Sequence, residues 1–256
     1  MSGSDVANRD RILVVVALIV LASLAWAYTV YLGLKMPAMA PGNSMSMPMM
    51  KAWSAPDFIF MFVMWAVMMF AMMLPSVTPT VMIFENVRAK REQSGRSFVP
   101  TGCFVAGYLL AWVGFSLVAT ALNWWLHTEG SLTSMMGRLA PATGGILLIF
   151  AGLFQWTRLK DACLEHCRSP MGFLMTHWHE GALGALRMGL HHGAYCLGCC
   201  WMLMVLLFVL GVMNLPWVAI LTIIVLAEKI VPHGRHLSRA LGLGLIAWGT
   251  WLIAAS

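Results

Sequence analysis

The sequence predicts an all-α fold, a polytopic transmembrane helical bundle of about seven spans, or six if the first is cleaved. Of the 256 residues, 60% are hydrophobic and only 10% are charged, whereas a soluble protein carries about 25% charged residues. Several apolar runs approach or exceed the roughly 20 residues that cross a bilayer as a helix. We therefore expect a single integral membrane domain over 1–256 and the lipid bilayer as its surroundings.

The first predicted span covers 12–34 and follows a short polar N-terminus. An Ala-Trp-Ala sequence at 25–27 is weakly typical of a signal-peptidase site. The apolar run nevertheless continues to Leu34, and this length favours a retained helix. Both interpretations place the next loop, 35–56, outside the cell.

That external loop is rich in methionine, with six methionines between Met36 and Met50. Thioethers bind Cu(I) and few other biological cations, so the loop is a candidate for capturing this ion. The run is explained equally well by a methionine-rich composition, with 22 in the whole chain, because methionine is also an adaptable apolar filler.

The second predicted span, 58–84, carries methionines at helical spacing, beginning beside the external loop. Core packing by flexible side chains explains this stripe more readily than metal transfer does. Pro75 and Pro79 are expected to interrupt the helix and to free backbone carbonyls. The stripe consists of Met61, Met64, Met68 and Met72.

The basic residues predict the orientation of the chain in the membrane. Lys and Arg concentrate in the loops at 85–99, 158–190 and 229–239, which share one side if the N-terminus is cytoplasmic. This is the positive-inside pattern, so the net charge of +6 reflects topology, and we expect no nucleic-acid partner. The remaining predicted spans are 100–126, 139–156, 191–214, 216–231 and 240–254.

Histidines and cysteines at the start of the predicted span 191–214 form the clearest candidate metal site. The sequence His191-His192-Gly-Ala-Tyr-Cys196-Leu-Gly-Cys199-Cys200 places His192 and the three cysteines at i, i+4, i+7 and i+8, on one helical face. Thiolate and imidazole are favoured ligands of Cu(I) and Zn(II). The alternative is that the cysteines only pack, since a free cysteine behaves as a small hydrophobe.

A second cluster, Cys163, His166 and Cys167, lies in the predicted cytoplasmic stretch that precedes this span, with its two cysteines one turn apart if helical. The cytosol is reducing, so these thiols are expected to stay available as ligands. Glu228 has two interpretations: an ion-pair partner of Lys229 or a nearby Arg, or an acceptor that orients a ligating histidine. Lys229 is expected to snorkel to the headgroups.

Four stretches resemble DUF2182, a bacterial group of predicted metal-binding integral membrane proteins. The stretches are AMMLPSVTPTVMIF at 71–84, KDACLEHCRSPMGF at 160–173, HHGAYCLGCCWMLM at 191–204, and GVMNLPW at 211–217 followed by EK at 228–229. The resemblance spans about 57–232 and implies a location in the bacterial inner membrane. It implies the ligands Cys163, Cys167, Cys196, Cys199, Cys200, His166, His191 and His192, with Met72 and Met73 from the first stretch.

The resemblance also implies copper handling: a membrane chaperone or transporter for Cu(I), more than for zinc, that supplies a copper enzyme such as a tyrosinase. The sequence contains no serine-histidine-aspartate pattern, phosphate loop or paired carboxylates, so we expect no enzyme. Two alternatives remain open. One is a thiol-disulfide oxidoreductase that uses Cys196 and Cys199, and the other is an assembly subunit in which methionine and cysteine only pack.

Overall fold

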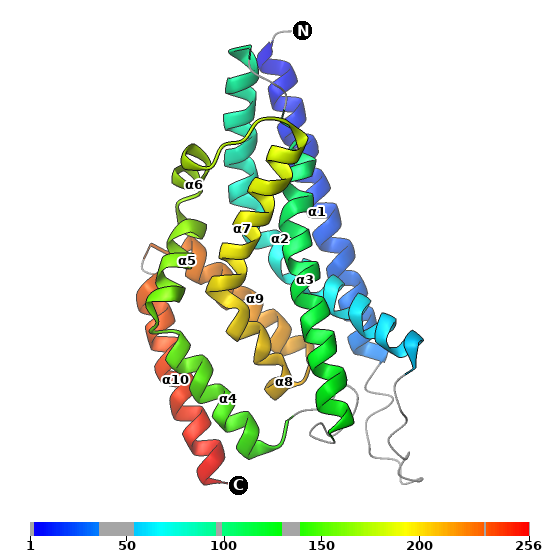
Figure 1. Cartoon of the computed structure of the whole chain (residues 1–256), viewed down its shortest axis with the longest axis vertical. Helices are drawn as coiled ribbons and strands as arrows, with labels where there is room; N and C mark the ends of the chain where they lie inside the picture. The colour runs from blue at the N-terminus through cyan, green and yellow to red at the C-terminus, as the bar shows by residue number, and fades with distance from the viewer. Residues whose placement is uncertain (1–2, 36–53, 96–98, 130–138, 233, 256) are drawn as a thin grey trace.

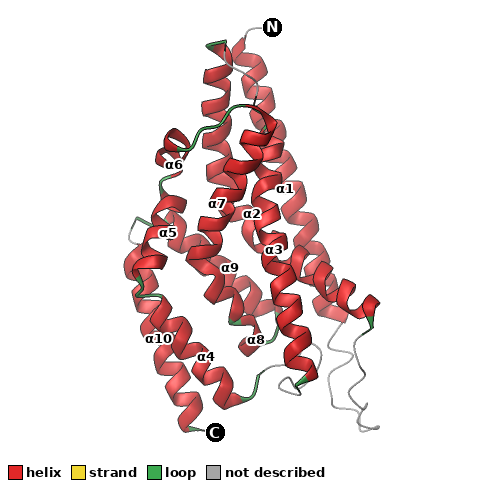
Figure 2. Cartoon of the chain, in the orientation of Figure 1, coloured by secondary structure: helices red, strands yellow, loops and turns green. Residues whose placement is uncertain are grey.

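A computed structural model describes residues 3–35, 54–95, 99–129, 139–232 and 234–255. The elements of these residues are α-helices packed as an elongated bundle (Figures 1 and 2), which confirms the predicted all-α class. Most of the methionine-rich loop predicted at 35–56 lies outside the described residues. The helices are α1 (Gly3–Lys35), α2 (Ala55–Gln93), α3 (Thr101–Thr128), α4 (Pro141–Phe154), α5 (Arg158–Arg168), α6 (Pro170–Thr176), α7 (Gly181–Val205), α8 (Leu207–Leu210), α9 (Leu215–Ile230) and α10 (Gly234–Ala254).

Five stretches of the described residues are long and apolar enough to cross a membrane, and they indicate a membrane protein. The helices α4 and α5 are long and apolar enough to cross a membrane only if they are taken together as one span, and they meet at a bend of 63°. The helix α9 has only 16 residues, fewer than the roughly 20 that a span needs. The structure thus offers five or six spans where the sequence predicts seven. The five are Arg9–Lys35, Ala55–Gln93, Thr101–Thr128, Gly181–Leu210 and Gly234–Ala254.

The sequence predicts that Pro75 and Pro79 interrupt the second helix and that a basic loop begins at 85. Instead, α2 continues through both prolines and on to Gln93. It begins with a capping box between Ser54 and Asp57. Around Pro75, the hydroxyl of Ser76 donates to the Met73 carbonyl oxygen at 2.9 Å and that of Thr78 donates to the Leu74 carbonyl oxygen at 2.9 Å, so side chains hydrogen-bond the backbone of this part of the helix. The helix changes direction along its length rather than ending (Figure 1).

Ion pairs explain why the charged end of α2 remains helical. Arg88 is buried and contacts Glu85 on its own helix and Asp10 of α1, with the Arg88–Asp10 pair at 3.2 Å. Arg91 pairs with Glu180, just before α7, at 2.7 Å. Charged pairs three residues apart stabilise a helix, and the longer-range pairs tie α1 and α7 to this end of α2.

The helix α7 begins at Gly181, ten residues before His191, where the sequence places the start of this span. Glycines explain the extension, because they allow α7 to lie directly against α3. A Cβ atom on Gly189 would overlap the carbonyl oxygen of Phe104, and one on Gly107 would overlap that of Leu186. Small residues allow such close backbone approach between membrane helices. The two histidines therefore lie about three turns inside the helix rather than at its mouth.

The core is built around the methionine-rich face of α2, which packs against α1, α3 and α9. The stripe predicted to pack as core is buried, since each of its methionines is at most 1% exposed. It runs from the beginning of α2 toward the cysteines of α7, so the same packing that fills the core also leads to the candidate site.

Candidate metal centre

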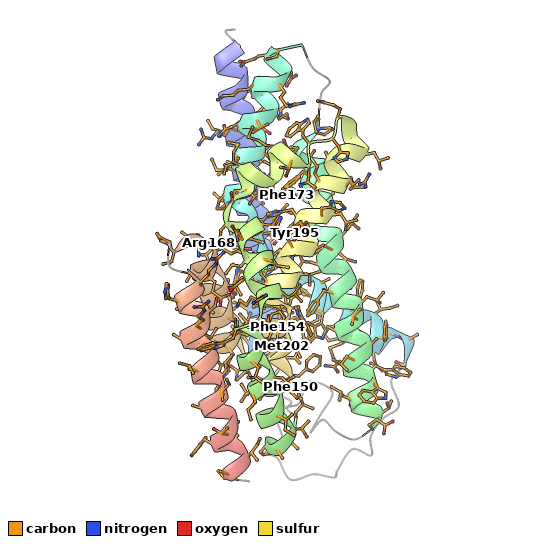
Figure 3. The ribbon with its side chains drawn as sticks, turned by 60° about the vertical axis from the view of Figure 1, so that its left-hand side comes forward. Phe150, Phe154, Arg168, Phe173, Tyr195 and Met202 are labelled. Atoms are coloured by element: carbon orange, nitrogen blue, oxygen red, sulfur yellow. The ribbon has the colours of Figure 1, made fainter. Side chains whose placement is uncertain are left out.

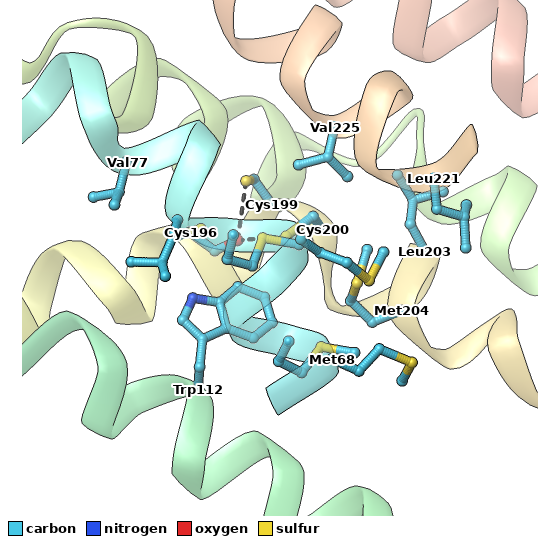
Figure 4. Close-up of a cluster of buried hydrophobic side chains, with 14 of the residues drawn as sticks. Met68, Val77, Trp112, Cys196, Cys199, Cys200, Leu203, Met204, Leu221 and Val225 are labelled. Atoms are coloured by element: carbon cyan, nitrogen blue, oxygen red, sulfur yellow. Dashed lines mark hydrogen bonds between the residues drawn. The ribbon is translucent and has the colours of Figure 1, made fainter. Parts of the chain in front are cut away.

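Three of the predicted ligands form the centre of the site. Cys196, Cys199 and Cys200 lie on the buried face of α7 and are each at most 1% exposed. The thiols of Cys199 and Cys200 both donate to the carbonyl oxygen of Cys196, at 3.0 Å. Figure 4 shows the three cysteines together with Met68 and Trp112. All six cysteines of the chain are free thiols, so the sulfur atoms are available as ligands.

The helix α5 brings a fourth thiol to this group. Cys167 is buried and belongs to the same packed core as Cys196 and Cys199, because α5 packs on α7. Cys163, one turn earlier, is half-buried and packs on Gly198, where a Cβ atom would lie 2.5 Å from its sulfur. The two cysteine motifs, about 30 residues apart in sequence, therefore meet in space. We define the thiol cluster as Cys163, Cys167, Cys196, Cys199 and Cys200.

Lys229 contacts the thiol cluster, and the sequence did not predict this contact. Its ammonium group donates to the sulfur of Cys196 and to the hydroxyl of Ser76, both at 3.0 Å. The hydroxyl of Tyr108 also lies 3.2 Å from the Cys196 sulfur. The expected snorkelling toward the headgroups is wrong, because Ser76 of α2 and Cys196 of α7 offer this side chain hydrogen-bond partners inside the bundle.

His192 is buried beside the thiol cluster, with 3% of its surface exposed. Its ring packs among those of Phe104, Tyr108 and Phe173, and its Nδ1 atom has no hydrogen-bond partner. An unpaired buried polar atom is costly and calls for an explanation. Because His192 stands one turn before Cys196 on the same face of α7, this nitrogen is a candidate ligand.

The other two predicted histidines have different surroundings. His166 is half-buried and stacks on Tyr195 with ring centroids 4.2 Å apart. Its Nδ1 atom lies 2.9 Å from the Ala162 carbonyl oxygen, which leaves Nε2 for a ligand. His191 is exposed and neighbours His177, away from the buried face of α7. In Figure 3, Phe173 of α6 and Tyr195 of α7 lie close to each other, in a T-shaped ring contact.

Met72 and Met73 are both buried in α2, at 1% and 0% exposure. The carbonyl oxygen of Met73 accepts a hydrogen bond from Tyr108 at 3.4 Å. This contact ties the backbone of the predicted thioether pair to the residues that surround Cys196.

Glu228 forms a buried ion pair with Lys160, a partner that neither interpretation of the sequence foresaw. Its carboxylate oxygens lie 2.7 and 2.9 Å from the Lys160 ammonium, and one accepts from Ser238 at 2.7 Å. Gln155 also accepts from Lys160. The pair fastens α5 to α9 and so supports the thiols of α5. The sequence predicted an ion-pair partner for Glu228, since buried charges are usually paired, but it did not identify Lys160 as that partner.

The donor set of the site fits a soft monovalent ion. Within the described ranges, no three His, Cys, Asp or Glu side chains already converge as ligands of one ion. The thiols of Cys199 and Cys200 instead point to a backbone carbonyl, and side-chain rotation would release them. Several thiols, a buried imidazole and neighbouring thioethers are ligands that select Cu(I), while oxygen donors suit Mg²⁺ and Ca²⁺.

Comparison with known proteins supports this chemistry. The model of a family described as PpoB2, copper chaperone, matches residues 62–252. It agrees with the copper-chaperone character that the resemblance implies, although it does not name DUF2182. No curated protein and no solved structure matches the chain. The matched range contains α2 from Phe62 onward and every residue of the thiol cluster.

Proposed function

The chain belongs to the PpoB2 copper chaperone family, and we propose from this that it binds Cu(I) at the thiol cluster and supplies it to a copper enzyme. The single observation that carries the proposal is the packing of α5, with Cys163 and Cys167, on the part of α7 that holds the other three cysteines of the cluster, where Cys163 lies against Gly198. Two helices that present soft ligands to one buried position form a site in which thiolates bind Cu(I) and water is excluded.

The gradient of exposure within the cluster supports a transfer role. Cys163 and His166 are half-buried, while Cys167 and Cys196 are buried. Ligands that lead from the surface to a closed site permit exchange of an ion between neighbouring sulfur atoms. We place the exchange with the recipient enzyme at Cys163 and His166.

We further propose that the chain lies in the bacterial inner membrane with its N-terminus in the cytoplasm. The ion pairs Arg88–Asp10 and Arg91–Glu180 gather basic residues at the end of the bundle where α1 begins, as the positive-inside rule requires. The buried methionine stripe of α2 would then pass Cu(I) from the outer side toward the thiol cluster.

The experiment that tests copper binding is anaerobic loading of the detergent-purified protein with Cu(I). We expect stoichiometric copper in the parent protein and its loss in the variant Cys196→Ser/Cys199→Ser/Cys200→Ser, because serine hydroxyls are poor ligands of Cu(I). Cys103→Ser, on α3 outside the thiol cluster, is the matched control and should retain copper. Absence of copper from the parent would overturn the proposal, and titration of a Cys196–Cys199 redox couple would then test the oxidoreductase alternative.

The unpaired nitrogen of His192 leads to a second prediction. Replacing His192 by leucine should weaken Cu(I) binding by at least about tenfold, because loss of a residue that only supports a ligand already costs about 10–100-fold. It should change stability little, since the Nδ1 atom of His192 has no hydrogen bond to lose. Competition titration with a chromophoric Cu(I) chelator measures the affinity, and thermal unfolding in detergent measures stability. His191→Leu, at an exposed position, is the control and should bind copper as the parent does. Equal affinity in the two variants would exclude His192 as a ligand.

A further inference from the structure

The positive charge of Lys229 is directed at a sulfur atom and not at a carboxylate. Its ammonium donates to Cys196 and Ser76. The neighbouring Glu228 is occupied by Lys160 instead. None of the ion pairs among the described residues includes Lys229. A half-buried cation without an anionic partner is costly in an apolar bundle, so its position calls for a compensating negative charge.

The surrounding hydrogen bonds hold the ammonium in this position. Ser76 accepts from Lys229 and donates to the Met73 carbonyl oxygen at 2.9 Å. Tyr108 contacts both this carbonyl oxygen and the sulfur of Cys196. Ser76 of α2 thus orients the cation toward Cys196, while Tyr108 of α3 contacts the Cys196 sulfur, on which a negative charge would develop when a metal binds.

We propose that Lys229 is the charge partner of the metal-thiolate centre and makes the site favour a monovalent soft ion bound by two thiolates. This inference rests on the function proposed above. Binding of Cu(I) to Cys196 and a second thiol of the cluster forms two copper-sulfur bonds and releases two protons to water, without oxidation or reduction. The product carries one negative charge, which Lys229 neutralises. A divalent ion bound by the same two thiolates would form a neutral complex and leave the ammonium uncompensated.

The test compares metals of equal geometry and different charge in variants of Lys229. Ag(I) and Cu(I) serve as monovalent probes. Hg(II) serves as a divalent probe that is also bound by two thiolates in linear geometry. Affinities are measured by competition with soluble thiols or chelators. In Lys229→Gln and Lys229→Leu, we expect Cu(I) and Ag(I) to bind about 10–100-fold more weakly, as for loss of a charge-assisted hydrogen bond, with Hg(II) binding unchanged.

Two controls separate charge from fold. Lys229→Arg keeps the cation and should restore monovalent binding, and Lys90→Gln removes an exposed lysine and should bind as the parent does. Ser76→Ala removes a hydrogen bond that orients the Lys229 ammonium and should weaken Ag(I) binding by a smaller factor than the Lys229 variants do. If the Lys229 variants do not fold, this variant still tests the inference.

The outcomes distinguish this inference from the proposed function. A parent protein that binds neither Cu(I) nor Ag(I) overturns both. A parent that binds them, with Lys229→Gln and Lys229→Leu equal to it, overturns the role of Lys229 alone. Equal loss of Ag(I) and Hg(II) would also overturn it, because such a loss reports damage to the thiols and not a missing charge.

Discussion

Replacement of Glu228 by glutamine is expected to lower the free energy of unfolding by about 3–5 kcal/mol. The carboxylate and its partner Lys160 are 1% and 0% exposed. Glutamine would leave the lysine ammonium buried without its counter-charge, and this loss costs far more than the ion pair itself contributes. Because the pair fastens α5 to α9, the position of Cys163 and Cys167 should loosen at the same time, and copper binding should fall.

Unfolding in detergent with increasing denaturant measures this loss of stability. The double variant Lys160→Met/Glu228→Leu should recover most of it, since apolar side chains of similar volume commonly replace a buried ion pair without cost. Glu165→Gln is the matched control at an exposed pair with Arg235, whose side chains are 66% and 51% exposed, and its effect should stay within about 1 kcal/mol. A Glu228→Gln protein as stable as this control would contradict a stabilising role for the buried pair.

Substitution of Gly189 by valine is the second change with a large expected effect. A Cβ atom at this position would overlap the Phe104 carbonyl oxygen and would lie 3.0 Å from the Tyr108 amide nitrogen. These are backbone atoms, so α3 must move away from α7, at a cost of about 3 kcal/mol or more. Tyr108 should then lose its contact with Cys196, and copper affinity should decrease together with stability.

Gly114 offers a control on α3, because a Cβ atom there meets no atom within 4 Å. Gly114→Ala should be neutral or more stable by about 0.5–1 kcal/mol, as expected for alanine in place of glycine within a helix. The measurements are thermal unfolding in detergent and competition titration with a Cu(I) chelator. A Gly189→Val protein that retains the stability of Gly114→Ala would show that α3 and α7 do not need their close contact.

Local features of the fold followed from the sequence because they depend on residues close together in the chain. The low charge content and the apolar runs predicted a helical membrane protein. The spacing of His192, Cys196 and Cys199 placed them on one face because an α-helix has 3.6 residues per turn. The helix boundaries were less predictable: α7 begins ten residues early because its glycines pack on α3, and α2 extends because Arg88 has acidic partners on α1 and α2.

The sequence by itself therefore determined the membrane class, the helical periodicity and the chemistry of the available ligands. Only the tertiary structure decided that Cys163 of α5 packs on Gly198 of α7, that Glu228 pairs with Lys160, and that Lys229 turns inward. The physical reason is that contacts within a helix follow from its own geometry. Contacts between helices depend instead on how closely the backbones approach and on which partner a buried charge finds.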